Sequence, residues 1–420
     1  MPDDMGKVVN MSRRGMTWMG ELTRGDKGPH ATAGNAVLIL CNDTAVVGLL
    51  AYDEFAHRIM VMRPPPPPYD GAQPSKGPYP RPMTDNDVTL MQGYMARTYD
   101  LRVSQGVAYQ AASAASEQNM IHPVRDWLNR LTWDGTPRLA TWLHTAFGCP
   151  NDAYHEAVGT KYLIAAVRRI RHPGAKFDAM LVLEGDQDLG KSSACRALFG
   201  DDNFSDDMPH DLASKDAPHS LMGVWGMELG ELDSLIRTGI ETVKAFLSRQ
   251  VDHYRPPYER NFVDRPRQCV LIGTTNESDW MRDSTGNRRF WPVRCVKAEH
   301  LWLAEVRDQL WAEAAILEAE GEPVWLDDET VRNTAKKHQA ERVAEDMWKR
   351  KIVQYLYNGT GGELAKVRTS DLLEHAVGLT PDKMNRANEM RAAGVLRALG
   401  WRSKVEWTDG KSERWWRPQQ

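Results

Sequence analysis

The chain has 420 residues, of which 41% are hydrophobic, and its formal net charge is −4. This length predicts two or three domains, and the lack of any apolar run of roughly 18 residues argues against a membrane protein. The N-terminus lacks the basic and then apolar plan of a signal peptide, so we expect a cytoplasmic protein. The five cysteines are odd in number and form no CxxC pair, which argues against a disulfide framework and a zinc site.

Residues 1–83 are expected to form a small N-terminal α+β region that ends in a proline-rich linker. The apolar runs at 36–40 and 45–50, separated by a turn-forming Asn-Asp pair, predict two short strands, neither with a recognisable site. The five prolines at 64–68 favour a stiff spacer over a docking ligand for an aromatic groove.

Residues 84–154 predict a helical region. Asp85 and Asp87, one residue apart, have the spacing of a metal-binding carboxylate pair. They directly follow Thr84 and precede an apolar helical pattern, so we interpret the segment as a helix N-terminus instead. The first 120 residues show no convincing metal-binding pair of carboxylates on a strand, so we do not expect primase activity.

Residues 155–345 alternate apolar strands with helices, the pattern of an α/β domain. A complete G-x-x-x-x-G-K-[ST] motif follows the apolar run 179–183 and predicts a P-loop that binds ATP with Mg²⁺. The predicted cofactor-binding residues are Gly185, Asp186, Gln187, Asp188, Leu189, Gly190, Lys191, Ser192 and Ser193. Lys191 should reach the phosphates, while the Ser192 hydroxyl should bind the metal.

Hydrolysis also needs carboxylates, a polar sensor and an arginine. An apolar run ends in Glu228 and Glu231, which we expect jointly to hold Mg²⁺ and orient water, although a solvated acidic turn is the alternative. Asn276 ends the run 269–275 and is the expected sensor, or else a strand cap. Arg288 and Arg289 follow a glycine turn, and one of them is expected to act as a finger supplied to a neighbouring chain, with the other in an ion pair.

Basic residues alternate with Tyr and His between positions 244 and 260, which suits single-stranded DNA. The candidate DNA-binding residues are Lys244, Arg249, Tyr254, Arg255 and Arg260. An ordinary surface hairpin is the alternative interpretation of this segment.

Taken in order, these motifs resemble the virulence-associated protein E family, whose core is similar to superfamily 3 helicases of phages and mobile elements. The resemblance covers roughly residues 120–345. It is carried by Trp133-Asp134-Gly135, the 254–258 segment and Thr285-Gly286-Asn287-Arg288-Arg289. It implies an AAA+-like P-loop ATPase core and a hexameric ring that moves on single-stranded DNA. It also implies that Arg249 and Arg255 face the DNA. The spaced glutamates depart from the adjacent acids common in that superfamily.

Residues 346–420 predict a winged helix: a short helix at 369–376, a longer one at 384–399, and a hairpin at 401–416 that turns at Asp409-Gly410. Residues 381–420 carry nine Lys/Arg against five Asp/Glu, so we expect contact with duplex DNA, with protein docking as the alternative.

The leading interpretation is an ATP-dependent replicative DNA helicase or translocase of a phage or mobile element. Two alternatives stay open. In one, ATP switches the assembly of a DNA-binding initiator or loader that does little unwinding. In the other, the ATPase regulates protein partners, with the proline run as a docking site.

Overall fold

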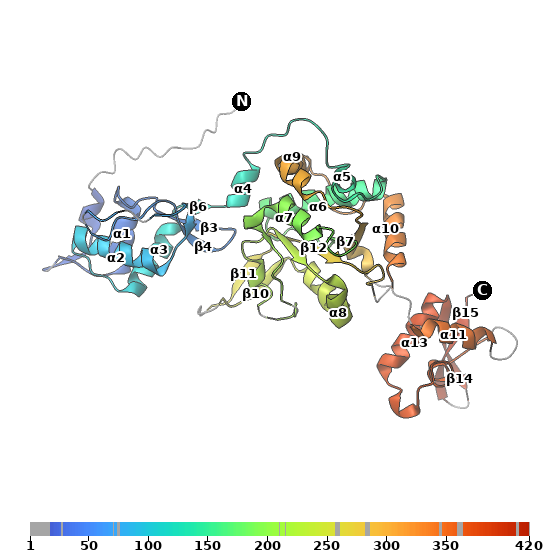
Figure 1. Cartoon of the computed structure of the whole chain (residues 1–420). Coiled ribbons are helices and arrows are strands. Elements are labelled where there is room, and N and C mark those ends of the chain that lie inside the picture. The colour runs from blue at the N-terminus through green and yellow to red at the C-terminus, as the bar shows by residue number, and fades with distance from the viewer. Residues whose placement is uncertain are drawn as a thin grey trace. The chain divides into compact units, whose positions relative to one another are not determined.

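The computed structural model describes residues 17–26, 28–69, 71–73, 76–209, 211–214, 216–256, 261–281, 286–343, 347–358, 364–408 and 411–419. The chain divides into two compact units (Figure 1). The large unit comprises Met1–Ser278 and Thr285–Gln339, and the C-terminal unit comprises Asp279–Ser284 and Ala340–Gln420.

The N-terminal part of the large unit is built around one apolar core. A four-stranded sheet in the order β5-β4-β3-β6 packs with three helices. The elements are η2 (Thr17–Glu21), β1 (Arg24–Gly25), β2 (Gly28–Pro29), α1 (Ala33–Asn42), β3 (Leu50–Asp53), β4 (Arg58–Val61), β5 (Arg81–Pro82), α2 (Asp85–Tyr99), α3 (Gln105–Ser116) and β6 (Met120–Ile121). Because this core extends from Trp18 to Ala115, the boundary expected at residue 83 runs through a single core.

The strand predicted at residues 36–40 is wrong, because these residues lie in α1. The Thr32 side chain caps this helix by accepting a hydrogen bond from the backbone N–H of Asn35. Ala36, Ile39 and Leu40 recur at helical spacing on its buried face. Turns occupy residues 44–48, so the second predicted strand is replaced by β3, which starts only at Leu50.

The proline run lies in the connection between β4 and β5 and does not separate two domains. Pro65 is buried. The guanidinium of Arg97 donates hydrogen bonds to the carbonyl oxygens of Pro67, at 2.7 Å, and Pro68. The run is therefore fixed against α2 and is not a free spacer.

Asp87 has a structural role at the start of α2. Its buried carboxylate accepts hydrogen bonds from both terminal nitrogens of Arg81, each at 2.7 Å, and from the backbone N–H of Thr84 at 2.8 Å. Thr84 and Asp87 together form a capping box. These contacts confirm the interpretation of the segment as a helix N-terminus.

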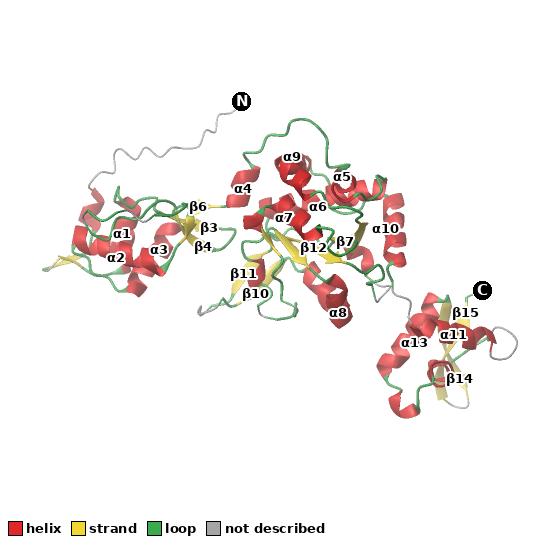
Figure 2. Cartoon of the chain, in the orientation of Figure 1, coloured by secondary structure: helices red, strands yellow, loops and turns green. Residues whose placement is uncertain are grey.

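A five-stranded parallel sheet forms the centre of the large unit, in the order β13-β7-β12-β9-β8 (Figure 2). Its strands are β7 (Met180–Glu184), β8 (Phe204–Ser205), β9 (Gly226–Leu229), β12 (Val270–Thr275) and β13 (Phe290–Arg294). Every neighbouring pair is parallel. This arrangement confirms the predicted α/β class.

Helices cover both faces of this sheet, with α6, α7 and α9 on one side in Figure 2 and α8 on the other. Leu181 and Leu183 of β7 belong to the core on the first side, whereas Met180 and Val182 surround Gly273 together with Leu232 of α8. The helices are α4 (Pro123–Leu128), α5 (Trp142–Phe147), α6 (Ala153–Arg171), α7 (Lys191–Phe199), α8 (Leu232–Ser248), α9 (His300–Ala319) and α10 (Glu329–Glu341), with 3-10 turns η3 (Asp201–Asn203), η4 (His219–Leu221) and η5 (Asn287–Arg289). Strands β10 (Val251–Tyr254) and β11 (Val263–Pro266) form an antiparallel hairpin between α8 and β12.

The C-terminal unit packs helices against a two-stranded hairpin. Its elements are α11 (Met347–Asn358), α12 (Thr369–Asp371), η6 (Leu372–Val377), η7 (Pro381–Lys383), α13 (Arg386–Ala398), β14 (Trp401–Thr408) and β15 (Lys411–Pro418). Trp401 and Trp416 from the hairpin pack in one core with Leu372 and Leu396 from the helices. The helices and the hairpin predicted here are present, while the turn at 409–410 lies outside the described residues.

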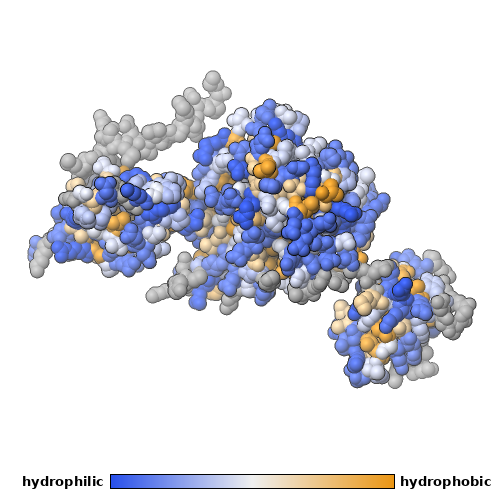
Figure 3. Space-filling view, in the orientation of Figure 1, coloured by the Kyte–Doolittle hydropathy of each residue, from blue (hydrophilic) through white to orange (hydrophobic). Residues whose placement is uncertain are grey.

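Within the described ranges, the structure contains no helix of the length and apolar character that a membrane crossing requires. The face of the large unit visible in Figure 3 is mainly hydrophilic, with apolar side chains in small separate patches.

Candidate nucleotide and nucleic-acid sites

The predicted polar residues gather where three parallel strands end. In the register of the sheet, Glu184 of β7 lies beside Thr275 of β12, and Leu229 of β9 lies beside Gly273. The segment 185–190 follows β7, Glu231 follows β9, and Asn276 follows β12. The carboxyl edge of the sheet therefore brings together the loop, an acidic residue and an amide that are far apart in the sequence.

The loop 185–190 turns tightly from β7 into α7. A Cβ atom at Gly185 would lie 2.7 Å from the carbonyl oxygen of Cys295, so only glycine fits beside the chain that leaves β13. Asp188 and Gly190 both have positive φ, 61° and 89°. Such a backbone turns successive N–H groups inward, and α7 begins directly behind it at Lys191. The geometry suits an anionic group at the helix N-terminus.

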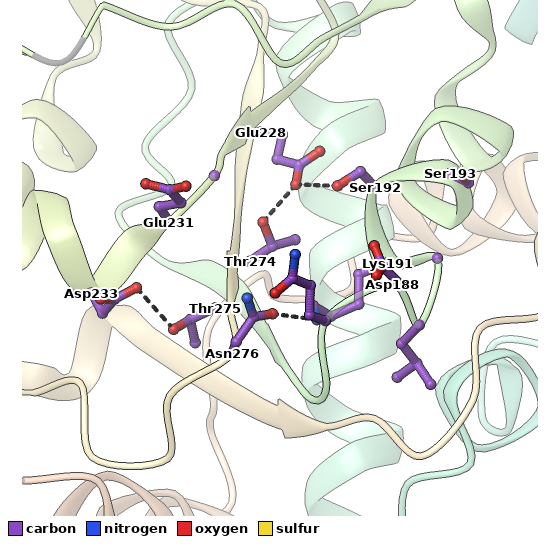
Figure 4. A pocket seen from close by; sticks show the side chains of 14 residues that line it. Asp188, Lys191, Ser192, Ser193, Glu228, Glu231, Asp233, Thr274, Thr275 and Asn276 are labelled. Atoms are coloured by element: carbon purple, nitrogen blue, oxygen red, sulfur yellow. Dashed lines mark hydrogen bonds between the residues drawn. The ribbon is translucent and has the colours of Figure 1, made fainter.

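The ammonium group of Lys191 is held inside this loop. It donates hydrogen bonds to the carbonyl oxygens of Gly185 at 2.7 Å and Asp186 at 2.8 Å, and to Oδ1 of Asn276 at 3.0 Å. Burial lowers the pKa of Lys191 below its usual value of 10.5. The predicted lysine and the predicted sensor amide are thus in direct contact (Figure 4).

Glu228 is the acidic residue that reaches the loop. Its side chain is buried, and its Oε1 accepts hydrogen bonds from the Ser192 hydroxyl at 2.7 Å and the Thr274 hydroxyl at 2.5 Å. Its Oε2 is buried and has no hydrogen-bond partner among the described residues. Hydroxyl and carboxylate oxygens are the ligands that Mg²⁺ prefers, so the Ser192 hydroxyl and the Glu228 carboxylate fit such an ion.

Glu231 has a different position from Glu228. It is exposed, has φ 47° and ψ 46°, and directly precedes α8, apart from Ser192 in Figure 4. Asp233, which the sequence analysis did not single out, accepts a hydrogen bond from the Thr275 hydroxyl at 3.3 Å. The proximity of Asp233 to Glu231 in the sequence was the only available signal for it.

These groups surround one cavity of about 480 Å³ at the carboxyl edge. Its lining residues are Gln187, Asp188, Leu189, Gly190, Lys191, Ser192, Ser193, Glu228, Gly230, Glu231, Asp233, Thr274, Thr275 and Asn276. The cavity therefore collects most of the predicted loop, both predicted glutamates and Asn276. Gly185 and Asp186 contribute through the carbonyl oxygens that bind Lys191.

Arg288 and Arg289 lie at the amino ends of the parallel strands, whereas the cavity lies at their carboxyl ends. They precede β13, whose first residue pairs with Met180 at the start of β7. The loop follows the far end of β7, on the order of 15 Å away at about 3.3 Å per residue. Arg289 donates a hydrogen bond to the Ser248 hydroxyl at 3.0 Å and lies 3.8 Å from Asp178, while the Arg288 side chain is 78% exposed. Neither arginine is among the described residues that line the 480 Å³ cavity of their own chain.

The predicted DNA-binding residues separate into buried and exposed groups. Lys244 is buried and pairs with Glu241 at 3.0 Å, and the buried Tyr254 donates its hydroxyl hydrogen to the sulfur of Met222 at 2.8 Å, so the prediction that these two contact DNA is wrong. Arg255 is exposed, and the Arg249 side chain is 40% exposed. Arg260 lies outside the described residues.

The hairpin β10–β11 offers an aromatic surface that the sequence analysis did not identify. The rings of His253 and Phe262 are stacked with centroids 5.0 Å apart, and Phe262 is 64% exposed. Asp264 is within hydrogen-bonding distance of His253 Nδ1, at 2.6 Å. The alternation along β10 places Val251 and His253 outside and Asp252 and Tyr254 inside.

An ion pair fixes the base of this hairpin. The buried guanidinium of Arg267 donates to both carboxylate oxygens of Asp252, at 2.7 and 2.9 Å, and also to the carbonyl oxygen of Phe246. The same guanidinium lies 4.2 Å from the centre of the Phe246 ring. Arg267 thus joins the hairpin to the end of α8.

Comparison with known protein families gives a match to the virulence-associated protein E-like domain over residues 128–344, about half of the chain. The chain belongs to this family. The matched virulence-associated protein E-like segment contains the loop 185–190, Glu228, Asn276, the hairpin β10–β11 and the arginine turn. No curated protein matches the chain.

Among solved structures, the virulence-associated protein E-like chain resembles the apo structure of the NrS-1 C-terminal region. The identity is 10% and the TM-score 0.46, and the likeness covers 87% of this chain and 94% of that one. An A form of the same region gives 11% identity and a TM-score of 0.45, with 87% and 95% coverage.

Proposed function

We propose that this chain is an ATP-driven DNA helicase or translocase that acts in the replication of a phage or other mobile element. Its working form would be a ring, with six subunits as the resemblance to superfamily 3 helicases implies, and ATP would be hydrolysed at the interfaces between subunits. The observation that carries this proposal is the meeting of Lys191, Ser192, Glu228 and Asn276 around one cavity at the end of three parallel strands.

The cavity supports ATP binding through a P-loop. Inward-facing backbone N–H groups and Lys191 would bind the phosphates, with Mg²⁺ held by Ser192 and by water on Glu228. Asn276 would hydrogen-bond the γ-phosphate and the attacking water, whose oxygen displaces ADP from the γ-phosphorus. The exposed Glu231 and the half-buried Asp233 line the same cavity and would complete its acidic side. The strand order β13-β7-β12-β9-β8 supports the AAA+-like assignment.

Arg288 is the better candidate for the finger, since its side chain is 78% exposed, whereas the Arg289 side chain is 22% exposed and donates a hydrogen bond to Ser248. Its position at the opposite edge of the sheet supports action on a neighbouring subunit's nucleotide. We expect Arg288→Ala to lower ATP turnover on the order of 10³-fold, and mixing it with Lys191→Ala to restore part of the turnover, because a mixed interface pairs an intact loop with an intact arginine. Steady-state phosphate release across mixing ratios measures this.

Arg289→Ala is the matched control for the mixing experiment. This substitution removes an arginine that contacts Ser248 of its own chain. Any loss of ATP turnover that it causes should therefore persist at every mixing ratio. Failure of Arg288→Ala to recover at any ratio would count against a finger supplied in trans.

The nucleic-acid contacts would come from two places. In the large unit, Arg249, Arg255 and the exposed ring of Phe262 on and around the hairpin β10–β11 offer charge and stacking to single-stranded DNA. In the C-terminal unit, the order of α12, η6, α13 and the β14–β15 hairpin supports the proposal of a winged helix, and Trp407 of β14 is 78% exposed. This unit would bind duplex DNA.

Strand displacement on a forked DNA substrate tests the proposal. We expect ATP-dependent unwinding by the wild-type chain and turnover of ATP that rises several-fold when single-stranded DNA is added. ATP turnover that does not change when single-stranded DNA is added would contradict the proposed helicase or translocase activity. ATP-dependent assembly on DNA without unwinding would favour the initiator or loader instead.

A further inference from the structure

A second cavity, of about 610 Å³, lies at the amino edge of the parallel sheet. Its walls come from residues 176–179 before β7, from the start of β13, from residues 324–326 between α9 and α10, and from one face of α10. A cavity of this size is in the range of about 300–1,000 Å³ that small-ligand sites occupy. Nothing in the site at the carboxyl edge uses it.

The interior of this cavity is apolar and aromatic. Phe177, Trp291 and Val324 line it and are each less than 10% exposed. Trp325 lines it as well, yet its side chain is 62% exposed. An exposed indole beside a buried aromatic floor can stack on a flat ring that enters the cavity.

The rim of the cavity is cationic. Lys176, Arg332 and Lys336 line it, together with Arg288, the proposed finger, and one carboxylate among the described lining residues, Asp178. Asp178 lies 3.9 Å from Arg288, so the charges of Arg332 and Lys336 on α10 are not offset by it. The ligand that complements this cavity has an aromatic ring and an anionic group.

A peptide strand does not suit the cavity, because the outer edge of β13 is already occupied. The Phe290 carbonyl oxygen accepts a hydrogen bond from Gln339 at 3.0 Å, and the Pro292 carbonyl oxygen accepts one from Tyr154 at 3.1 Å. Pro292 also has no N–H to donate. Addition of a strand from a protein partner along this edge is therefore blocked.

We propose that this cavity binds a nucleotide of single-stranded nucleic acid, with the base stacked on Trp325 and the phosphates beside Lys336, Arg332 and Lys176. It would be a contact additional to the hairpin β10–β11, formed by different elements. The inference rests on the proposed function only for the choice of nucleic acid as ligand.

The test measures binding of a fluorescein-labelled oligo(dT) by anisotropy at several salt concentrations. Lys336→Gln should weaken binding and reduce the salt slope by about 0.7, the value for one lost phosphate contact on a single strand. The matched control is Lys337→Gln, which removes the same charge from the next residue of α10, outside the cavity lining, and should leave the slope unchanged. Trp325→Ala should weaken binding about tenfold with the slope unchanged.

Equal effects of the two lysine substitutions would overturn the inference. Unchanged oligo(dT) affinity in Trp325→Ala would overturn it as well. A change in sedimentation mass with unchanged DNA affinity would overturn it in favour of a contact between subunits. Loss of binding in Arg255→Ala but not in the cavity variants would refute this inference alone. A wild-type chain that binds no oligo(dT) would contradict the proposed function as well.

Discussion

Lys191→Ala is expected to lower ATP turnover by about 10² to 10³-fold while the protein stays folded. Among the described residues that line the cavity at the carboxyl edge, Lys191 is the one that carries a positive charge, so no other residue of this lining can replace it. Lys191→Arg should be nearly as inactive, because the planar guanidinium cannot occupy the place of a compact ammonium between Gly185, Asp186 and Asn276. Steady-state phosphate release measures the effect.

Lys337→Ala serves as the control for this substitution, since it removes an exposed lysine of the same unit outside the cavity. It should leave turnover within about twofold of wild type, as surface changes away from such features have small effects. Near-normal turnover in Lys191→Ala would refute hydrolysis at this cavity. Loss of the thermal transition would instead indicate unfolding, which circular dichroism detects.

Arg267→Ala is expected to lower the free energy of unfolding by about 3–5 kcal/mol, because it leaves Asp252 as a buried charge without its bidentate partner. Arg249, 3.8 Å from the same carboxylate, is too distant for a hydrogen bond and would compensate only in part. Urea unfolding followed by circular dichroism gives the free energy.

Two further variants show whether the buried charge is the cause. The double substitution Asp252→Leu with Arg267→Met should recover part of the stability, since replacing both charges removes the unpaired group. Arg102→Ala breaks an ion pair whose side chains are 84% and 70% exposed, and should change stability by less than about 1 kcal/mol. Equal losses in Arg267→Ala and Arg102→Ala would contradict a structural role for the Arg267–Asp252 pair.

The sequence predicted the centre of the large unit well, because its signals are local. Continuous apolar runs such as 179–183 are typical of strands buried on both faces, and β7 is completely buried. The carboxyl ends of neighbouring parallel strands lie on the same side of a sheet, so polar residues at those ends come close together. The proximity of Glu228 and Asn276 to the loop therefore followed from the class of fold.

The errors arose where the sequence pattern was ambiguous or where burial depends on distant partners. The run 36–40 is short and apolar, and only the capping role of Thr32 distinguishes helix from strand. Lys244 and Tyr254 carry polar atoms typical of a surface, yet Glu241 and Met222 satisfy these atoms. Thr274 could not be recognised as a partner of Glu228, because this pairing depends on the register of β9 and β12.

Strand β13 runs from the arginine turn to the loop 185–190. The arginine turn lies at the start of this strand. Just beyond its end, the backbone N–H of Cys295 donates a hydrogen bond to the carbonyl oxygen of Glu184 at 2.6 Å. The carbonyl oxygen of Cys295 faces Gly185. Strand β13 thus joins the arginine turn to the loop 185–190 through a continuous backbone. If the proposed ring forms, the arginine offered to a neighbour and the loop of the subunit's own cavity are the two ends of one five-residue strand.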